Sequence, residues 1–359
     1  MKVLVINTVR FLVNGISSTI MEIYRNLRDD ITFEFIVNEK LAKEYELEFK
    51  ENGTAYFILP NRKKHLLKYR KSLCRILREN KYDIVHIHGN SSTMFIETSL
   101  KDLSNSKIIV HCHNIDTPYR LLNLILRPLF INSFDLALAC SDEAGSFLYK
   151  DKPYIIIRNS VKCELYRFDP EKRRELREKL KIDDKKVILH VGRFNEQKNH
   201  KFLIEVIKKM DNLDDYIFVF IGDGDLAVKI KRKISELHFE NNCLFLGTKK
   251  DIWNYYNIAD LFVLPSLYES FGIVLLEAQI NGLKCLCSSN IPRDIDFTGN
   301  VCFLDLDCCN WIDYLKNFDF NYKRNDYVVR AKEAGFSCEN VTQNYKMVYE
   351  DILKQKEEL

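Results

Sequence analysis

The segment from Ala259 to Gly282 constrains the fold of this chain more than any other stretch. Its apolar start, Ala259–Leu264, is short and bulky enough for a buried parallel strand, and Pro265 ends that strand because proline cannot donate to a ladder. Gly272 then opens a helical pattern that stops near Gly282. Strand, turn and helix in this order are the repeating unit of an open parallel sheet, whose ligands lie beyond the carboxyl ends of the strands.

Two carboxylates bracket this turn. Glu269 lies in the loop after the strand, and Glu277 lies in the helix that follows. An ionised carboxylate only accepts hydrogen bonds, so both side chains suit the vicinal hydroxyls of a sugar or a ribose. The alternative is a solvated loop residue and an exposed helix residue, and spacing alone leaves it open.

Strand-like and helix-like patterns alternate along the 359 residues. This alternation predicts parallel, doubly wound sheets with right-handed crossovers. The charged segment Asp169–Lys186 separates two series of strands. We therefore expect an α/β chain of two Rossmann-like domains, residues 1–168 and 169–336, facing each other across a cleft. The expected strands are Lys2–Asn7, Thr32–Val37, Ala55–Leu59, Ile84–His88, Lys107–Cys112, Leu136–Cys140, Lys186–Val191, Ile217–Ile221, Cys243–Leu246, Asp260–Leu264 and Lys284–Cys287.

A cationic loop follows the strand that ends at Val191. Gly192 lets backbone approach a ligand, while Arg193 and Lys198 bring a planar fork and a point charge to the same sheet edge. The next helix directs its positive end there. This set fits a diphosphate, and the alternative is two solvated basic residues in a loop.

These two motifs resemble those of retaining family-4 glycosyltransferases, which have the GT-B fold. Glu-Ser-Phe-Gly-x4-Glu is similar to their Glu-x7-Glu signature, and Gly-Arg-x4-Lys-Asn to their phosphate motif. The resemblance implies that Arg193 and Lys198 hold the diphosphate of a nucleotide sugar. It also implies that Glu269 holds the sugar hydroxyls and Glu277 the ribose hydroxyls. The remaining donor-site residues are then Gly192, Ser270, Phe271, Gly272 and Ile273.

The resemblance extends over nearly the whole chain, with departures. It implies that a final helix, about residues 337–356, crosses back to the first domain. The family's interdomain Asn-Gly-Val-Asp is replaced by Asn159-Ser160-Val161-Lys162, and Lys284 stands where proline is usual. Neither departure removes a residue of the phosphate motif.

Asn14-Gly15 lies just beyond the first strand, where the family often has Gly-Gly. Rossmann folds bring backbone close to phosphates at this position, although a plain turn glycine is an equal alternative. No Gly-x-Gly-x-x-Gly follows, which argues against a nicotinamide cofactor.

Histidines occur in two pairs, His86-x-His88 and His111-x-His113, each on one side of a strand. A metal site would need a third ligand, and none is apparent, so no metal is expected. The resemblance implies that His113 contacts the donor sugar near the reacting carbon, with His111 as the core alternative. His88 lies near the acceptor or in the core.

Two acidic pairs separated by one residue, Asp223/Asp225 and Asp305/Asp307, are also discounted as metal ligands. The cationic loop supplies the positive charge that a divalent ion would supply. The expected transferase therefore has no cofactor and requires no metal.

Two stretches of the first domain suit an anionic membrane. The stretch from Asn61 to Lys81 contains nine basic residues, Lys81 included, against one acid. Within it, Arg62–Asn80 has an apolar face of Leu66, Tyr69, Leu73, Ile76 and Leu77. Its alternative is a core-facing helix with a basic solvated side; nucleic acid fits less well, because no recognition motif accompanies it. Pro118–Phe134 is unusually apolar and is expected to cover the acceptor site, enter the membrane interface or belong to the core.

The function implied by the resemblance is retaining transfer of a hexose or N-acetylhexosamine from a nucleotide sugar, UDP-linked, to a hydroxyl of a lipid-linked glycan. The subfamily resembled makes capsule, exopolysaccharide or lipopolysaccharide, with capsule and exopolysaccharide enzymes of Gram-positive bacteria the most similar. The start lacks a signal-peptide pattern, no apolar run reaches about 20 residues, and the 11 cysteines lack zinc-site spacing. We expect a cytoplasmic protein peripheral to the inner face of the plasma membrane. The alternatives are a non-catalytic nucleotide-sugar or glycan-binding subunit and a sugar-nucleotide epimerase of the same fold.

Overall fold

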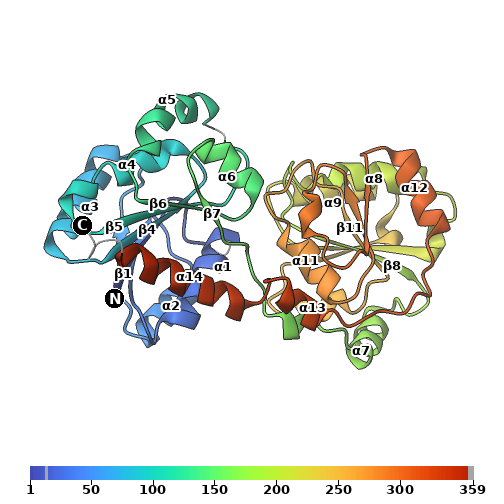
Figure 1. The fold of residues 1–359 in the computed structure, drawn as a ribbon. Coiled ribbons are helices and arrows are strands. Elements are labelled where there is room, and N and C mark those ends of the chain that lie inside the picture. The colour runs from blue at the N-terminus through green and yellow to red at the C-terminus, as the bar shows by residue number, and fades with distance from the viewer. Residues whose placement is uncertain (13–14, 118, 355–359) are drawn as a thin grey trace. The chain divides into compact units, whose positions relative to one another are not determined.

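The computed structural model describes residues 1–12, 15–117 and 119–354 (Figure 1). The chain divides into two compact units: unit 1 is Met1–Ser160 with Cys338–Leu359, and unit 2 is Val161–Ser337. The expected boundary after residue 168 thus lies inside unit 2. Each unit is a parallel sheet with helices on both faces, which confirms the predicted pair of Rossmann-like α/β domains.

Unit 1 contains a sheet in the order β3-β2-β1-β4-β5-β6-β7 with every pairing parallel. The order reverses between β1 and β4, which places a ligand-binding edge at their carboxyl ends. The periodicity identified every strand except β7, which has two exposed residues and therefore no apolar signal. The strands are β1 Lys2–Asn7, β2 Thr32–Asn38, β3 Tyr56–Leu59, β4 Ile84–Gly89, β5 Lys107–Cys112, β6 Leu136–Ala139 and β7 Ile155–Ile156.

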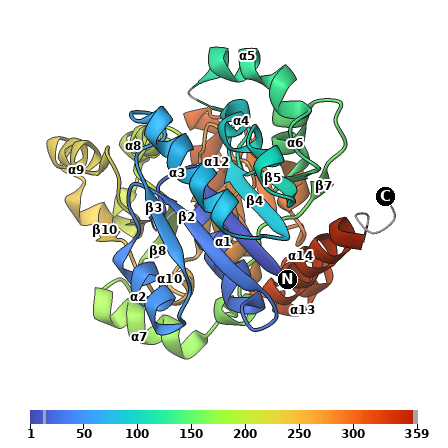
Figure 2. The same cartoon turned by 90° about the vertical axis from the view of Figure 1, so that its left-hand side faces the viewer.

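Two groups of helices cover the two faces of this sheet (Figure 2). One face packs on α1 Gly15–Leu27, α2 Lys43–Glu51 and α14 Cys338–Lys354. The other carries α3 Leu66–Glu79, α4 Phe95–Thr98, α5 Arg120–Ile131 and α6 Asp142–Tyr149. The final helix α14 belongs to unit 1 because Val341, Tyr345, Tyr349 and Ile352 enter the same core as Val3 and Val5.

Unit 2 has a six-stranded sheet in the order β10-β9-β8-β11-β12-β13, with the reversal between β8 and β11. The strands are β8 Lys186–Val191, β9 Tyr216–Ile221, β10 Cys243–Gly247, β11 Leu261–Leu264, β12 Cys285–Ser288 and β13 Val301–Leu304. Its helices are α7 Pro170–Leu180, α8 His200–Lys209, α9 Ala227–Glu236, α10 Ile252–Tyr256, α11 Ile273–Ile280, α12 Cys308–Asn317 and α13 Val328–Glu333. The carboxyl ends of β8 and β11 are therefore the place where a ligand-binding edge is expected.

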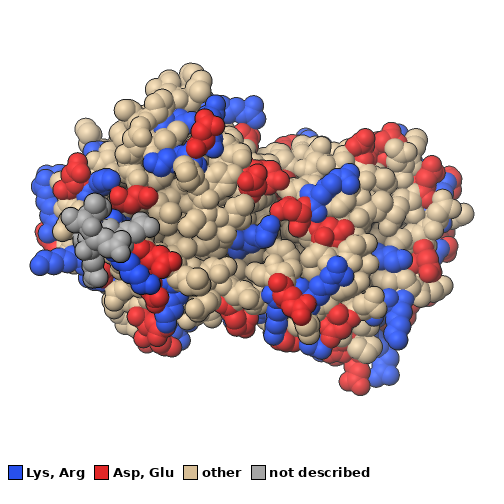
Figure 3. Space-filling model, viewed as in Figure 1, with Lys and Arg blue, Asp and Glu red and all other residues tan. Residues whose placement is uncertain are grey.

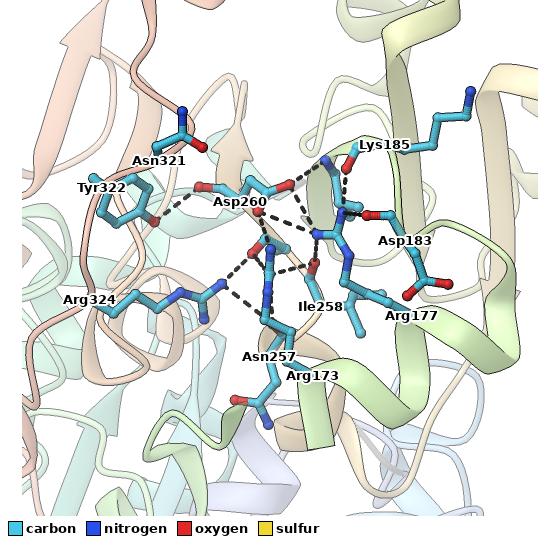
Figure 4. Close-up of polar contacts among 12 residues, drawn as sticks. Arg173, Arg177, Asp183, Lys185, Asn257, Ile258, Asp260, Asn321, Tyr322 and Arg324 are labelled. Carbon is cyan, nitrogen blue, oxygen red and sulfur yellow. Dashed lines mark hydrogen bonds and ion pairs between the residues drawn. The ribbon is translucent and has the colours of Figure 1, made fainter. Parts of the chain in front are cut away.

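A buried polar cluster fixes the opposite end of β11 (Figure 4). Asp260, directly before the strand, accepts from Arg173 and Arg177 of α7, and its Oδ2 accepts the amide of Val187 at 2.8 Å. Arg324 donates to the neighbouring carbonyl of Ala259. Burial lowers the pKa of Arg324 to about 10, and the positive charges of Arg173 and Arg177 act in the same direction. The cluster ties α7 and the 322–324 segment to the sheet.

Replacing Asp260 with asparagine keeps the shape of the side chain and removes the only carboxylate described at the centre of this cluster. Because the guanidinium groups of Arg173 and Arg177 then lose their charged partner, we expect unit 2 to lose about 3–5 kcal/mol of unfolding free energy. Urea unfolding followed by circular dichroism measures this. Asp211→Asn, which breaks an exposed ion pair with Lys316, is the control and is expected to leave the midpoint unchanged. Equal urea midpoints in Asp260→Asn and Asp211→Asn would contradict a stabilising role for the Asp260 cluster.

Candidate active site

The loops after β8 and β11 lie at the carboxyl edge of unit 2 and are bonded to each other. The amide of Leu267 donates to the carbonyl of Gln197 at 2.8 Å, and Gln197 Nε2 donates to the carbonyl of Tyr268 at 3.0 Å. Asn199 Nδ2 donates to the carbonyl of Pro265 at 3.2 Å. The two motifs found in the sequence are therefore neighbours in space.

Lys198 and Glu269 form a buried ion pair at this edge. Lys198 Nζ lies 2.6 Å from Glu269 Oε1, and the side chains are only 13% and 8% exposed. Ser266 Oγ donates to the same carboxylate oxygen at 2.6 Å. The alternative of solvated loop residues is thus wrong for both members of the pair. An ammonium group has three donors, so Lys198 can keep this bond and still donate to an anion.

Gly192 provides the space that the lysine occupies. A Cβ added at Gly192 would lie 3.0 Å from Lys198 Cδ, and one added at Gly222 would lie 2.1 Å from the carbonyl oxygen of Gly192. Gly222 also has a φ of +137°, which disfavours any other residue. Backbone from two loops therefore packs closely beneath the lysine.

Arg193 has a different environment from Lys198. Its side chain is 64% exposed, and its guanidinium pairs at 3.3 Å with Asp225, which is also exposed. The alternative of a solvated cation is correct for this residue. Such an exposed pair contributes little, so the guanidinium can leave Asp225 for an incoming anion.

Glu277 is buried in α11 and held by two phenols. Tyr166 Oη donates to Oε1 at 2.7 Å, and Tyr256 Oη donates to Oε2 at 2.5 Å. Burial raises the pKa of Glu277 to about 6, and the two phenol hydrogen bonds act in the opposite direction. The alternative of an exposed helix residue is wrong. The carboxylate is fixed in orientation, and each oxygen keeps accepting capacity for a hydroxyl group.

The sequence did not indicate the residues that support these acids. Tyr166 and Tyr256 are remote from Glu277 along the chain, so no local spacing connects them. Ser266 was the one supporting residue with a usable signal, because a hydroxyl directly after a strand-ending proline lies at the same sheet edge as Glu269.

Other expected donor-site residues lie on the same turn with different exposures. Ser270 and Ile273 are half-buried, and Gly272 has a φ of +82° at the start of α11. The ring of Phe271 is buried 5.9 Å from that of Phe336, so only its backbone is available to a ligand.

The expected residues of the first domain lie in unit 1. Gly15 is the first residue of α1, with nothing within 4 Å of an added Cβ, whereas Asn14 lies outside the described residues. His113 follows β5, and its Nε2 lies 2.8 Å from Nδ1 of His88.

The expectation that the histidine pairs lack a third metal ligand is wrong. Strands β4 and β5 pair in a register that places His88 opposite His111, and His86 lies on the same face. One ring nitrogen from each of these three residues lies within 4.8 Å of the others. The sequence could not show this, because the pairing register of the two strands was unknown.

Comparisons with known proteins identify the family of this chain. Residues 13–165 match the family described as Glycosyltransferase Family 4, and residues 172–293 match Glycosyl transferases group 1. The chain is 30% identical over 306 residues to the UDP-Gal:alpha-D-GlcNAc-diphosphoundecaprenol alpha-1,3-galactosyltransferase of Escherichia coli, covering 76% of each chain. It is 28% identical to the putative glycosyltransferase EpsF of Bacillus subtilis (strain 168), covering 79% of this chain and 78% of that protein.

Fold and site together define a glycosyltransferase. The chain belongs to glycosyltransferase family 4. Among solved structures, Anabaena Alr3699/HepE in complex with UDP is similar, with a TM-score of 0.79 over 98% of this chain and 100% of that one at 17% identity. This likeness shows the GT-B fold.

Replacing Glu277 with glutamine tests the consequence of burying this carboxyl. Folding raises its pKa from 4.5 to about 6, so the folded state binds the proton more tightly. The stability contributed by this group is therefore present at acid pH and declines as pH rises from about 4 to about 7, by about 2 kcal/mol. We expect unfolding free energies of wild type and Glu277→Gln to diverge by that amount across this range. Parallel curves, like those expected for exposed Glu236→Gln, would contradict the perturbed pKa.

Proposed function

We propose that this enzyme transfers a hexose or N-acetylhexosamine from a UDP-sugar to a hydroxyl of a lipid-linked glycan, with retention of anomeric configuration. The product would be a capsule, exopolysaccharide or lipopolysaccharide. The observation that carries the donor half of the proposal is the buried pair of Lys198 and Glu269 at the edge where a ligand is expected. The name of the E. coli relative, with its UDP-linked donor and diphosphoundecaprenol acceptor, supports the same substrate classes.

The side chains that bind the nucleotide sugar have separate roles in the proposed reaction. Lys198 and Arg193 neutralise the diphosphate, Glu269 accepts from the sugar hydroxyls, and Glu277 accepts from the ribose. As the bond between the sugar carbon and the phosphate oxygen breaks, negative charge grows on that oxygen, and a cation already in place stabilises the transition state more than the ground state. The acceptor hydroxyl attacks from the same face and gives its proton to the departing phosphate.

Unit 1 supplies the other groups of the proposed reaction. His113 contacts the donor sugar near the reacting carbon, and Asn14 and Gly15 contact its phosphates or the acceptor. No cofactor or metal takes part in the transfer, because Lys198 and Arg193 provide the charge. The family membership favours this transferase over the epimerase or non-catalytic alternatives.

Removing the lysine tests the donor site. We expect Lys198→Ala and Arg193→Ala each to lower sugar transfer at least ~100-fold, since a preorganised donor to the leaving group contributes about that much. Transfer is measured as UDP release and as product on a lipid-linked acceptor. Lys201→Ala is the matched control, because Lys201, three residues after Lys198, is an exposed lysine paired with Glu196. Near-normal turnover in both variants, with an unchanged melting temperature, would remove the two cations from the mechanism.

The α5 helix exposes an apolar surface. Leu121 is 72% and Ile125 62% exposed, and among the described residues of α5 only Asn123 and Phe130 are buried. In Figure 3 the top of unit 1, where α5 lies, is largely tan, with blue and red side chains beside and below it. Of the three expectations for Pro118–Phe134, membership of the core holds for Phe130 and Phe134 but not for the exposed face of α5. Such a patch indicates an interaction site.

Basic side chains lie beside this patch. Lys63, Lys64, Lys68 and Lys71 are exposed at the start of α3, as is Leu67 at 83%. Lys63 Nζ lies 2.5 Å from Tyr119 Oη, which joins the two stretches directly. Apolar and cationic groups side by side fit the surface of an anionic bilayer. None of the helices described has the length and apolarity to cross a membrane.

A basic cavity adjoins the same surface. Its volume is about 480 Å³, and its wall runs from the carboxyl ends of β1, β2 and β4 to Tyr119. Arg10, Arg62, Lys63 and Lys64 contribute to it. A cationic cavity next to an apolar helix suits an acceptor that has an anionic head and a lipid tail. We assign the head group of the lipid-linked acceptor to this cavity.

Flotation with vesicles tests the membrane contact. We expect the full chain to float with vesicles containing anionic lipid, and the triple variant Leu121→Ser, Leu124→Ser, Ile125→Ser to lose most of this binding, because it removes the apolar contact. Val228→Ser, at an exposed apolar residue of unit 2, is the control and keeps binding. Neutralising Lys63, Lys64, Lys68 and Lys71 is expected to abolish the preference for anionic over neutral vesicles. Unchanged flotation of both multiple variants would show that these helices do not contact lipid.

A further inference from the structure

Four histidines lie together under α14 in unit 1. His86 and His88 come from β4, and His111 and His113 come from the end of β5. The first three are buried, with ring centroids 4.0 Å apart for His86 and His88, and 5.4 Å apart for His88 and His111. His113 is half-buried, and its ring centroid lies 4.1 Å from that of His111.

Each buried imidazole is held through its Nδ1 by a group outside the trio His86, His88 and His111. Tyr349 Oη lies 2.7 Å from Nδ1 of His86, and Tyr345 Oη lies 3.1 Å from Nδ1 of His111. Nε2 of His113 lies 2.8 Å from Nδ1 of His88. Metal-binding histidines have this arrangement, because a partner on one ring nitrogen fixes the tautomer and directs the other nitrogen at the ion.

Two ring nitrogens of the trio lack a hydrogen-bond partner among the residues described, which indicates a missing ligand. Nε2 of His86 and Nε2 of His111 are buried and have no hydrogen-bond partner among the residues described. Buried polar atoms are nearly always satisfied, so two unsatisfied ring nitrogens in one cluster require an explanation. A bound ion satisfies both at once.

We propose that His86, His88 and His111 bind a divalent transition-metal ion through their Nε2 atoms, with zinc as the metal that fits best. Neutral imidazole suits zinc among the biologically common divalent ions, and three histidines leave a fourth position open. One nitrogen from each ring already lies within 4.8 Å of the others, and bonds of about 2.0–2.1 Å to one ion require the rings to move closer together.

A second pair of histidines, in unit 2, lacks the third ligand that the trio has. In unit 2 the rings of His190 and His200 lie 4.6 Å apart and also have unsatisfied nitrogens. However, His86, His88 and His111 are the only group of three or more metal-ligating residues found in the described chain. His190 therefore serves as a buried control.

The proposed ion has a structural role, and its binding can be measured separately from the proposed transfer reaction. Its ligands come from two strands, and the tyrosines that orient two of them come from α14. Binding therefore fastens the last helix of the chain to the sheet of unit 1. Metal uptake and thermal stability report on it without any sugar donor.

Metal analysis of the chelator-treated full chain tests this proposal. We expect one equivalent of zinc to be retained after dialysis, and a rise in melting temperature with zinc, because an ion that binds only the folded state stabilises it. Cobalt in place of zinc is expected to give the visible absorption of a low-symmetry nitrogen site. His86→Gln and His111→Gln should lose the retained ion, whereas His190→Gln should keep it. No retained zinc and no thermal shift in wild type, as a bridging water would give, overturns the proposal, and so does equal retention in the histidine variants.

The tyrosines provide a second test should a histidine variant fail to fold. Tyr345→Phe with Tyr349→Phe leaves the three ligands in place and removes two of their orienting partners. We expect zinc affinity to fall about 10–100-fold for loss of such partners. An unchanged affinity in this variant would overturn the assigned geometry.

Discussion

The ion pair between Lys198 and Glu269 is the interaction on which the proposed donor site depends. A buried pair is favourable only when further hydrogen bonds satisfy its members, and here Ser266 supplies one to the carboxylate. The pair fixes a cation between two loops before any ligand arrives. A charge held in this way needs no reorganisation as negative charge develops, which is the condition for electrostatic catalysis.

Strand β11 has a buried carboxylate near each end. The cations that compensate the two negative charges differ. Asp260 before the strand is surrounded by arginines that also bond backbone carbonyls, so its cluster is closed. Glu269 beyond the strand has a lysine with donors to spare. The amino end of the strand is therefore used to hold α7 and the sheet together, and the carboxyl end is left able to bind.

Periodicity predicted most strands because buried parallel strands form short, continuous apolar runs. It could not predict which charged side chains are buried. Arg193 and Lys198 looked equivalent in the sequence, yet one is solvated and the other is buried, because Gly192 and Glu269 make a place only for the lysine. The tyrosines on Glu277 and the histidine trio were missed for a related reason: each depends on contacts between segments whose register or separation the sequence does not show.

The exposed face of α5 limits what its partner can be. An apolar patch left in water promotes association between copies of a protein, so its presence on the folded unit argues for a regular occupant. The neighbouring start of α3 adds lysines rather than acids, and Lys63 contacts Tyr119 at the junction. The proposed occupant is therefore one that is apolar and anionic over the same small area. An anionic bilayer has both properties at every point of its surface, and a lipid-linked acceptor in that bilayer would present its head group to the basic cavity alongside.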